Sequence, residues 1–154
     1  MSESTIFTIE QVKSRIAEAF PTAVKFESKE KPRRLFMSAD KGSLLELCKL
    51  LKDQLGFEHC TMVCGVDRID RFQCVYHISS IANRIVVEIV IDLPKDNPEI
   101  DSVTPLWEGA NWHERETYDM FGFIFVGHPK PERILLPEDV TFFPLRKDFK
   151  VGGI

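Results

Sequence analysis

The stretch WHERETYDMFG, residues 112–122, mixes charged and aromatic side chains in front of a glycine. With the residues before it, this stretch predicts a helix over 107–121 that ends at Gly122, because glycine is the usual residue just past a helix end. On a helical wheel Glu114 falls in the middle of one side. A carboxylate in that position is costly unless it is paired or hydrogen-bonded. The residues that share this side with Glu114 are Trp107, Ala110, Asn111, Thr117, Tyr118 and Phe121.

Arg115 and Asp119 lie on an adjacent side of the predicted helix, next to Trp112. Their spacing allows them to pair along the helix surface. An exposed pair of this kind stabilises a helix by only a few tenths of a kcal/mol.

Three interpretations of this helix compete. The first is a catalytic or metal site built from His113, Glu114, Glu116 and Asp119. A helical zinc protease needs a second histidine four residues after His113, and Thr117 stands there. The second is a solvated charged helix with ordinary ion pairs. The third is a docking helix whose charged network is completed by the chain's own C-terminal segment or by a partner.

The residues before this helix predict two further helices and five strands. Thr8 and Gln11 form a capping box at the start of the first helix. Asp40 is the expected N-cap of the second helix, and Gly56 the expected stop. The order of elements indicates an α+β, two-layer domain with a mostly antiparallel sheet and about three helices. The helices are expected near 9–20 and 44–55, and the strands at 24–26, 34–38, 59–66, 72–80 and 84–91.

Two connections complete this prediction. Ala82-Asn83 is expected to form a tight turn, since asparagine tolerates positive φ, and to join the last two strands in a hairpin. The segment from Pro94 to Pro105 is expected to lack regular structure.

The C-terminal segment after residue 122 is rich in proline and in large apolar residues. Pro129, Pro131, Pro137 and Pro144 rule out a long helix, whereas a disordered tail would be poorer in large apolar residues. We therefore predict an α+β domain over 1–126 and an extended docking arm over 127–154. The arm buries its apolar side chains either against the domain itself or against another chain.

Composition narrows the class of protein. The net charge is −4, so no overall basic field attracts nucleic acid, although Lys31, Arg33 and Arg34 form a short basic cluster. The most apolar stretch, 85–93, has the length of a strand and contains Glu88, so no membrane-spanning helix is expected. The polar start of the chain lacks the features of a signal peptide. We expect a cytoplasmic chain whose membrane association, if any, runs through a partner.

The four cysteines are expected to be thiols in a reducing compartment. Cys60 and Cys64 are spaced more widely than a metal-binding CxxC pair. His59 beside Cys60 keeps a metal site open, and burial as small apolar side chains is the alternative. The four are Cys48, Cys60, Cys64 and Cys74.

Several ordered motifs resemble the 30-kDa subunit family of respiratory complex I. The resemblance is strong from Asn97 onward and weak before about Phe57. The sequence departs from the family pattern at Glu132, Val140 and Phe143. The matching segments are 112–122, 125–129, 133–139 and 144–149, with Tyr76-His77, Asn97-Pro98 and Ser102-Val103 upstream.

The resemblance implies a structural subunit without iron–sulfur cluster or flavin. Such subunits sit in the hydrophilic arm of complex I-like membrane complexes, which include NADH or deazaflavin:quinone or phenazine oxidoreductases and energy-converting hydrogenases. They pack against a large hydrogenase-like subunit, and iron–sulfur clusters are expected in partner subunits. We expect a peripheral position on the cytoplasmic side of the membrane, with no nucleic acid partner and no direct membrane insertion.

The resemblance implies no catalytic residue in this chain. In the arm, Arg146 and Lys147 would anchor the segment to carboxylates, and arginine suits a bidentate contact better. His128 before Pro129 is expected to hold a turn. The residues expected to dock or to order the docking surface are Trp112, Glu114, Arg115, Glu116, Tyr118, Asp119, Phe121, Gly122, His128, Pro129, Arg133, Phe142, Phe143, Leu145, Arg146, Lys147, Asp148 and Phe149.

A rival hypothesis stays open from the sequence. The chain could be a stand-alone soluble enzyme or metal-binding domain that uses the acidic third helix or a cysteine cluster. That hypothesis predicts bound metal and a monomeric, active chain. Its cysteine site would consist of His59, Cys60, Cys64 and Cys74.

Overall fold

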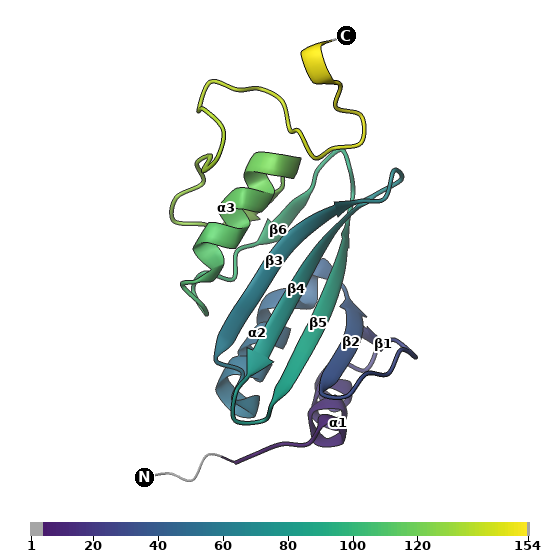
Figure 1. Ribbon diagram of the computed structural model, residues 1–154. Helices are drawn as coiled ribbons and strands as arrows, with labels where there is room; N and C mark the ends of the chain where they lie inside the picture. Colours follow the sequence, from purple (N-terminus) through teal and green to yellow (C-terminus); the bar gives the residue numbers. More distant parts are fainter. Residues whose placement is uncertain (1–4, 154) are drawn as a thin grey trace.

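The computed structural model describes residues 5–153 and shows a two-layer α+β arrangement (Figure 1). One layer is a five-stranded sheet in the order β1-β2-β5-β4-β3. Within this sheet only the β2–β5 pair is parallel, so the predicted mostly antiparallel sheet is confirmed. The strands are β1 (Val24–Phe26), β2 (Arg34–Ala39), β3 (His59–Asp67), β4 (Phe72–Ser80) and β5 (Ile85–Leu93).

Strand register gives the sheet one apolar and one mixed face. Tyr76 of β4 lies opposite Val63 of β3 and Ile89 of β5, and all three side chains point into the core. His77, one residue later, lies opposite Glu88 on the other face, where the two side chains pair at 2.9 Å. The alternation predicted for 85–91 is therefore confirmed.

Helices α1 (Ile9–Ala19) and α2 (Leu44–Lys49) cover the apolar face, behind the sheet as Figure 1 is drawn. The capping box of Thr8 and Gln11 is confirmed, with both bonds present. The second helix differs from the prediction. Residues 41–43 form a 3-10 turn without a side-chain bond from Asp40, and residues 50–54 form a π-helical turn. Gly56, with φ of 72°, ends this helical region as predicted.

Two corrections concern connections. In the β4–β5 turn Arg84 takes the positive φ of 56°, not Asn83. Asn83 acts through its side chain instead, which accepts a bond from Phe7 N and donates to the Leu55 carbonyl. The segment from Pro94 to Pro105 contains a short strand, β6 (Glu99–Asp101), which pairs in parallel with β7 (Ile124–Val126).

Helix α3 (Ala110–Phe121) packs beside β3 and begins three residues later than predicted. Trp107 lies in the turn before it, buried, and donates from Nε1 to the Phe57 carbonyl at 3.2 Å. Gly122 ends α3 with φ of 79°, as predicted. Within residues 5–153 no helix is long and apolar enough to cross a membrane.

Candidate functional site

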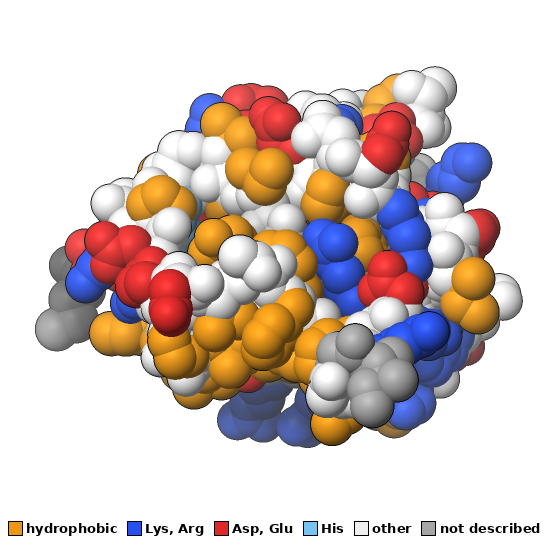
Figure 2. Space-filling model, turned by 90° about the horizontal axis from the view of Figure 1, so that it is seen from above, with side chains coloured by type: hydrophobic (Ala, Val, Ile, Leu, Met, Phe, Trp, Pro, Cys, Tyr) orange, Lys and Arg blue, Asp and Glu red, His pale blue; other side chains and the backbone are white. Residues whose placement is uncertain are grey.

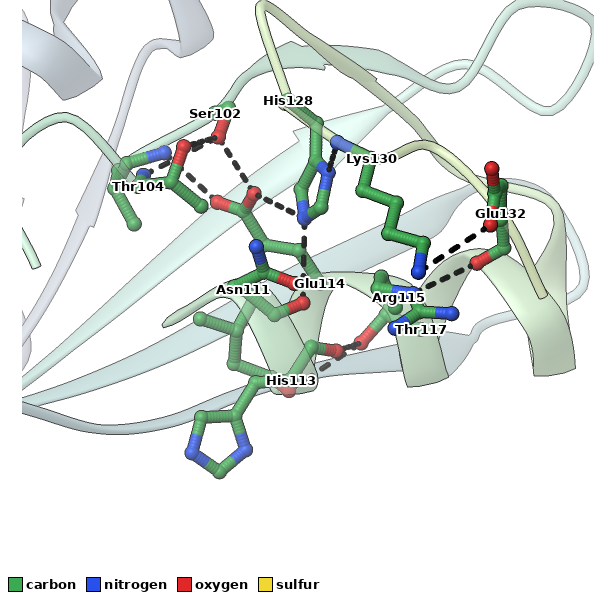
Figure 3. Close-up of polar contacts among 12 residues, drawn as sticks. Ser102, Thr104, Asn111, His113, Glu114, Arg115, Thr117, His128, Lys130 and Glu132 are labelled. Atoms are coloured by element: carbon green, nitrogen blue, oxygen red, sulfur yellow. Dashed lines mark hydrogen bonds and ion pairs between the residues drawn. The ribbon is translucent and has the colours of Figure 1, made fainter. Parts of the chain in front are cut away.

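Glu114 is fully buried on the inner side of α3, and its carboxylate is satisfied by the loop after β6. Oε1 accepts from Val103 N and Oε2 from the Ser102 hydroxyl, both at 2.7 Å. Thr104 Oγ1 lies 2.7 Å from the same hydroxyl (Figure 3). Burial raises the pKa of Glu114 to about 7, although the two hydrogen bonds oppose the shift. The predicted need for a partner at this carboxylate is confirmed.

His128 closes the same network from the start of the arm. Its Nδ1 accepts the main-chain N–H of Lys130 at 2.9 Å, so this nitrogen carries no proton. Its Nε2 lies 3.2 Å from the Asn111 carbonyl and 3.8 Å from Glu114 Oε2. Nε2 is then the ring nitrogen placed to donate to the Asn111 carbonyl. These contacts tie the segment after His128 to the start of α3.

Arg115 and Asp119 do not pair, which corrects the expectation from their spacing. Arg115 is buried and donates to the carbonyl groups of Glu132 and Arg133, at 3.0 and 2.8 Å. Its guanidinium also lies over the ring of Trp112, 5.6 Å from the centroid. Arg115 thus binds main-chain carbonyls of the arm instead of the Asp119 carboxylate on its own helix.

Asp119 is the anchor point for the middle of the arm. Its Oδ1 accepts from Arg133 Nη1 at 2.7 Å, and its Oδ2 accepts three consecutive main-chain N–H groups, from Ile134, Leu135 and Leu136. Burial alone would raise the pKa of Asp119, but these hydrogen bonds outweigh it and hold the pKa below its usual value.

Arg133 completes the clamp from the arm side. Its Nη1 also reaches the Asp119 carbonyl, and its Nη2 donates to the carbonyls of Val140 and Phe142. The ring of Phe143 lies 4.9 Å from its guanidinium carbon. At Val140, a position where the sequence departs from the family pattern, the contact uses the main chain, so the side chain is free to vary.

The end of the arm returns to α3 and to the sheet. Arg146 donates from Nε to the Phe121 carbonyl at 2.6 Å. The main-chain N–H of Lys147 donates to Asp67 Oδ2 at 2.9 Å, and Lys95 pairs with the other oxygen of Asp67. No sequence pattern indicated the contact of Asp67, which lies buried at the end of β3.

The arm is thus tied to the domain, but several of its apolar side chains face outward. Phe142 is 45% exposed and Leu145 is 55% exposed, whereas Phe143 and Phe149 are half-buried. Figure 2 views the molecule from above Figure 1, the side on which the arm lies, and shows hydrophobic side chains gathered beside basic ones. The remaining predicted residues divide by exposure. Tyr118, Phe121 and Gly122 are buried or half-buried, and Trp112, Glu116, Pro129, Lys147 and Asp148 are exposed.

The rival metal site does not assemble. Cys60 and Cys74 point to the apolar face of the sheet, and Cys64, opposite Val75, points to the other face. Burial raises the pKa of the Cys60 thiol to about 12, which keeps it protonated. Across residues 5–153 no group of three or more His, Cys, Asp or Glu could hold a metal ion. The acidic helix does not converge either, since Glu114 and Asp119 have separate partners and Glu116 faces solvent.

Known proteins are similar to this chain in sequence and in fold. A subunit of the F(420)H(2) dehydrogenase of Methanosarcina mazei is 40% identical over 134 residues, covering 85% of each chain. A subunit of the NADH-quinone oxidoreductase of a Roseiflexus species is 42% identical over 147 residues, covering 92% of this chain and 84% of that one.

Two solved structures are similar to this chain in fold. The trypsin-resistant fragment of Nqo5 is similar with a TM-score of 0.68 at 27% identity, covering 77% of this chain and 98% of that one. A chain of an archaeal membrane-bound sulfane sulfur reductase shares the fold, with a TM-score of 0.80 at 22% identity and coverage of 92% and 85%. A family model described as "Respiratory-chain NADH dehydrogenase, 30 Kd subunit" matches residues 37–154. The chain therefore belongs to the 30-kDa subunit family of respiratory-chain NADH dehydrogenase.

Proposed function

We propose that the chain is a structural subunit of a complex I-like, membrane-associated respiratory redox complex. Family membership and relatives named as subunits of NADH-quinone oxidoreductase and of F(420)H(2) dehydrogenase support this proposal. Its partners are a hydrogenase-like large subunit and iron–sulfur subunits. The chain binds no cluster or flavin and lies on the cytoplasmic side, attached to the membrane through those partners.

The observation that carries the proposal concerns the arm: its backbone is hydrogen-bonded to the domain, while some of its large apolar side chains face solvent. The buried Asp119–Arg133 pair and the Arg115 contacts hold the arm backbone against α3. Phe142 and Leu145 nevertheless remain about half exposed. Large apolar side chains held on a rigid backbone lose little freedom on binding, so their burial against a partner contributes directly to affinity.

The acidic side chains of α3 have a role that fits a structural subunit. Glu114 is hydrogen-bonded to the loop after β6, and Asp119 is hydrogen-bonded to the arm. Neither side chain is exposed to solvent. We infer that this helix shapes the docking surface and performs no chemistry. Electron transfer belongs to the partner subunits.

A tagged chain isolated from gently solubilised native membranes tests this proposal. We expect a hydrogenase-like large subunit and iron–sulfur subunits to co-purify, identified by mass spectrometry, with iron–sulfur absorbance in the complex. The chain purified alone should contain no stoichiometric iron, zinc or flavin. A monomeric chain recovered only from the soluble fraction, or one with a stoichiometric metal, would contradict the proposal.

A further inference from the structure

Three arginines, two of them in the arm, tie the arm to α3, and they differ in how many of their donors are used. Arg133 makes four hydrogen bonds within the chain, and Arg115 makes two. Arg146 makes one, from Nε to the Phe121 carbonyl. Between residues 5 and 153, no hydrogen bond or ion pair uses its Nη1 or Nη2. Neither nitrogen is among the fully buried polar atoms that lack a hydrogen-bond partner in this part of the chain. These two nitrogens therefore keep unused donors with some solvent exposure.

The Arg146 guanidinium is held in place even though these donors are unused. Its central carbon lies 4.6 Å from the ring centroid of Phe143 and 5.2 Å from that of Phe72. Its Nη2 also passes close to Gly122, where an added Cβ would come within 2.6 Å. Stacking on two rings and one fixed donor remove most of the side chain's freedom before any partner binds.

The charge around Arg146 favours an anion. Lys147 and Lys150 are exposed on the same segment, with Asp148 as the acidic exception. The buried carboxylate that contacts this segment, Asp67, already pairs with Lys95 at 2.6 Å and accepts the main-chain N–H of Lys147. It therefore does not compete for Arg146.

Apolar surface flanks this basic group. Phe142 and Leu145 are two exposed apolar side chains within four residues before Arg146, and the Phe142 ring lies 5.2 Å from that of Phe149. A planar fork donor beside exposed apolar side chains matches a carboxylate set among apolar residues, the usual make-up of a protein interface.

We propose that Arg146 is a bidentate anchor for an aspartate or glutamate of the hydrogenase-like large subunit, with Phe142 and Leu145 packed against apolar side chains beside that carboxylate. This inference rests on the docking role proposed above. It deepens that role by naming the residue and the chemistry of its counterpart.

The test compares tagged full-length chains in native membranes. Arg146→Lys keeps the charge but removes the fork and the stacking, so recovery of the large subunit should fall at least about tenfold. Arg34→Lys is the matched control, because Arg34 is an exposed arginine on β2, outside the arm and the docking surface; recovery should stay within about twofold. Thermal unfolding and trypsin cleavage of each free chain establish that the arm remains folded.

A second measurement identifies the counterpart and keeps the test independent of arm folding. A photo-crosslinker at Leu145 should capture a large-subunit peptide that contains Asp or Glu. Changing that carboxylate to its amide should reproduce the loss caused by Arg146→Lys and add nothing to it in the double variant.

Each outcome has a distinct meaning. If the wild-type chain recovers no large subunit, the proposed function fails as well as this inference. If Arg146→Lys recovers as much as wild type, or the amide change has no effect, the anchor alone is wrong. Binding to vesicles that contain phosphatidylglycerol, lost in Arg146→Lys and without a cross-link to the large subunit, would assign Arg146 to a lipid phosphate and overturn the proposal.

Discussion

Arg133 and Asp119 form a buried ion pair across 14 residues of sequence, with Nη1 and Oδ1 2.7 Å apart. The side chains are 4% and 0% exposed. The pair fastens the arm to the last turns of α3. Removing one partner from a buried pair leaves an uncompensated charge, which is far more damaging than the loss of a surface pair.

Asp119→Asn should therefore lower the free energy of unfolding by about 3 kcal/mol, because an amide NH₂ would face the N–H groups that now donate to Oδ2. Urea denaturation measures the change. Asp70→Asn is the control, since Asp70 pairs with Arg71 on the surface; it should cost less than about 1 kcal/mol. Equal losses in the two variants would show that the clamp does not hold the arm.

Glu114 should make stability depend on pH near neutrality. Its pKa is raised by burial from 4.5 to about 7 in the folded chain, so the folded form binds this proton more tightly than the unfolded form. Its contribution is fully present below about pH 4.5 and is lost as pH rises through 7, a change of roughly 2–4 kcal/mol.

Urea denaturation of wild type and Glu114→Gln between pH 4.5 and 8 measures this contribution. The difference in unfolding free energy between the two proteins should shift by that amount, with wild type relatively more stable at the acid end. A difference that is constant with pH would mean that Glu114 titrates near its ordinary value.

Gly122 is needed both for its backbone conformation and for the space that it leaves. Its φ is 79°, and an added Cβ would lie 2.6 Å from Arg146 Nη2 and 2.8 Å from the Phe143 ring. Gly127 also has positive φ, 84°, but nothing lies within 4 Å of its Cβ position. Gly127→Ala should cost about 1 kcal/mol from the backbone alone, and Gly122→Ala should cost clearly more and displace the end of the arm.

Thermal unfolding and trypsin cleavage after Arg146 and Lys147 measure the two glycine variants. Faster cleavage is expected in Gly122→Ala only. If both variants lose the same stability and resist trypsin equally, the packing of Arg146 against Gly122 does not matter for the arm.

Asp67 should protect the end of the arm from proteolysis. Its Oδ2 accepts the main-chain N–H of Lys147, and its other oxygen pairs with Lys95. In Asp67→Asn we expect faster trypsin cleavage after Lys147, because the segment must leave the surface to enter the protease. Asp139→Asn, which changes an exposed carboxylate elsewhere in the arm, should cleave at the wild-type rate. Identical rates for both variants would argue against this anchor.

Local sequence patterns predicted most of the fold because its strands and helices are strongly periodic. The alternating residues of β5 and the capping box before α1 each have a short-range physical cause, and both are confirmed. Strand β6 was missed, since three residues between prolines give no periodic signal and its pairing partner, β7, follows the whole of α3. The π-helical turn at 50–54 likewise had no signature in the sequence.

The candidate site was only half predictable. The buried position of Glu114 followed from the helical wheel, but Ser102 and Val103, its partners, lie in a loop that periodicity does not describe. The spacing of Arg115 and Asp119 predicted a pair, whereas both side chains bind groups of the arm that lie 14 to 18 residues away. Local spacing cannot reveal such long-range competition. The docking residues came from the family resemblance, and their docking role remains a prediction.

The most direct test of the docking role is the co-purification of the large subunit with a chain whose outward apolar surface is made polar. Phe142→Ser with Leu145→Ser leaves the Arg133 contacts to main-chain carbonyls in place. Ile81→Ser, at a 70% exposed position in the β4–β5 turn far from the arm, is the control (Figure 1). We predict that the double variant folds but recovers at least about tenfold less large subunit, while the control matches wild type. Full recovery with the folded double variant would contradict docking through the arm.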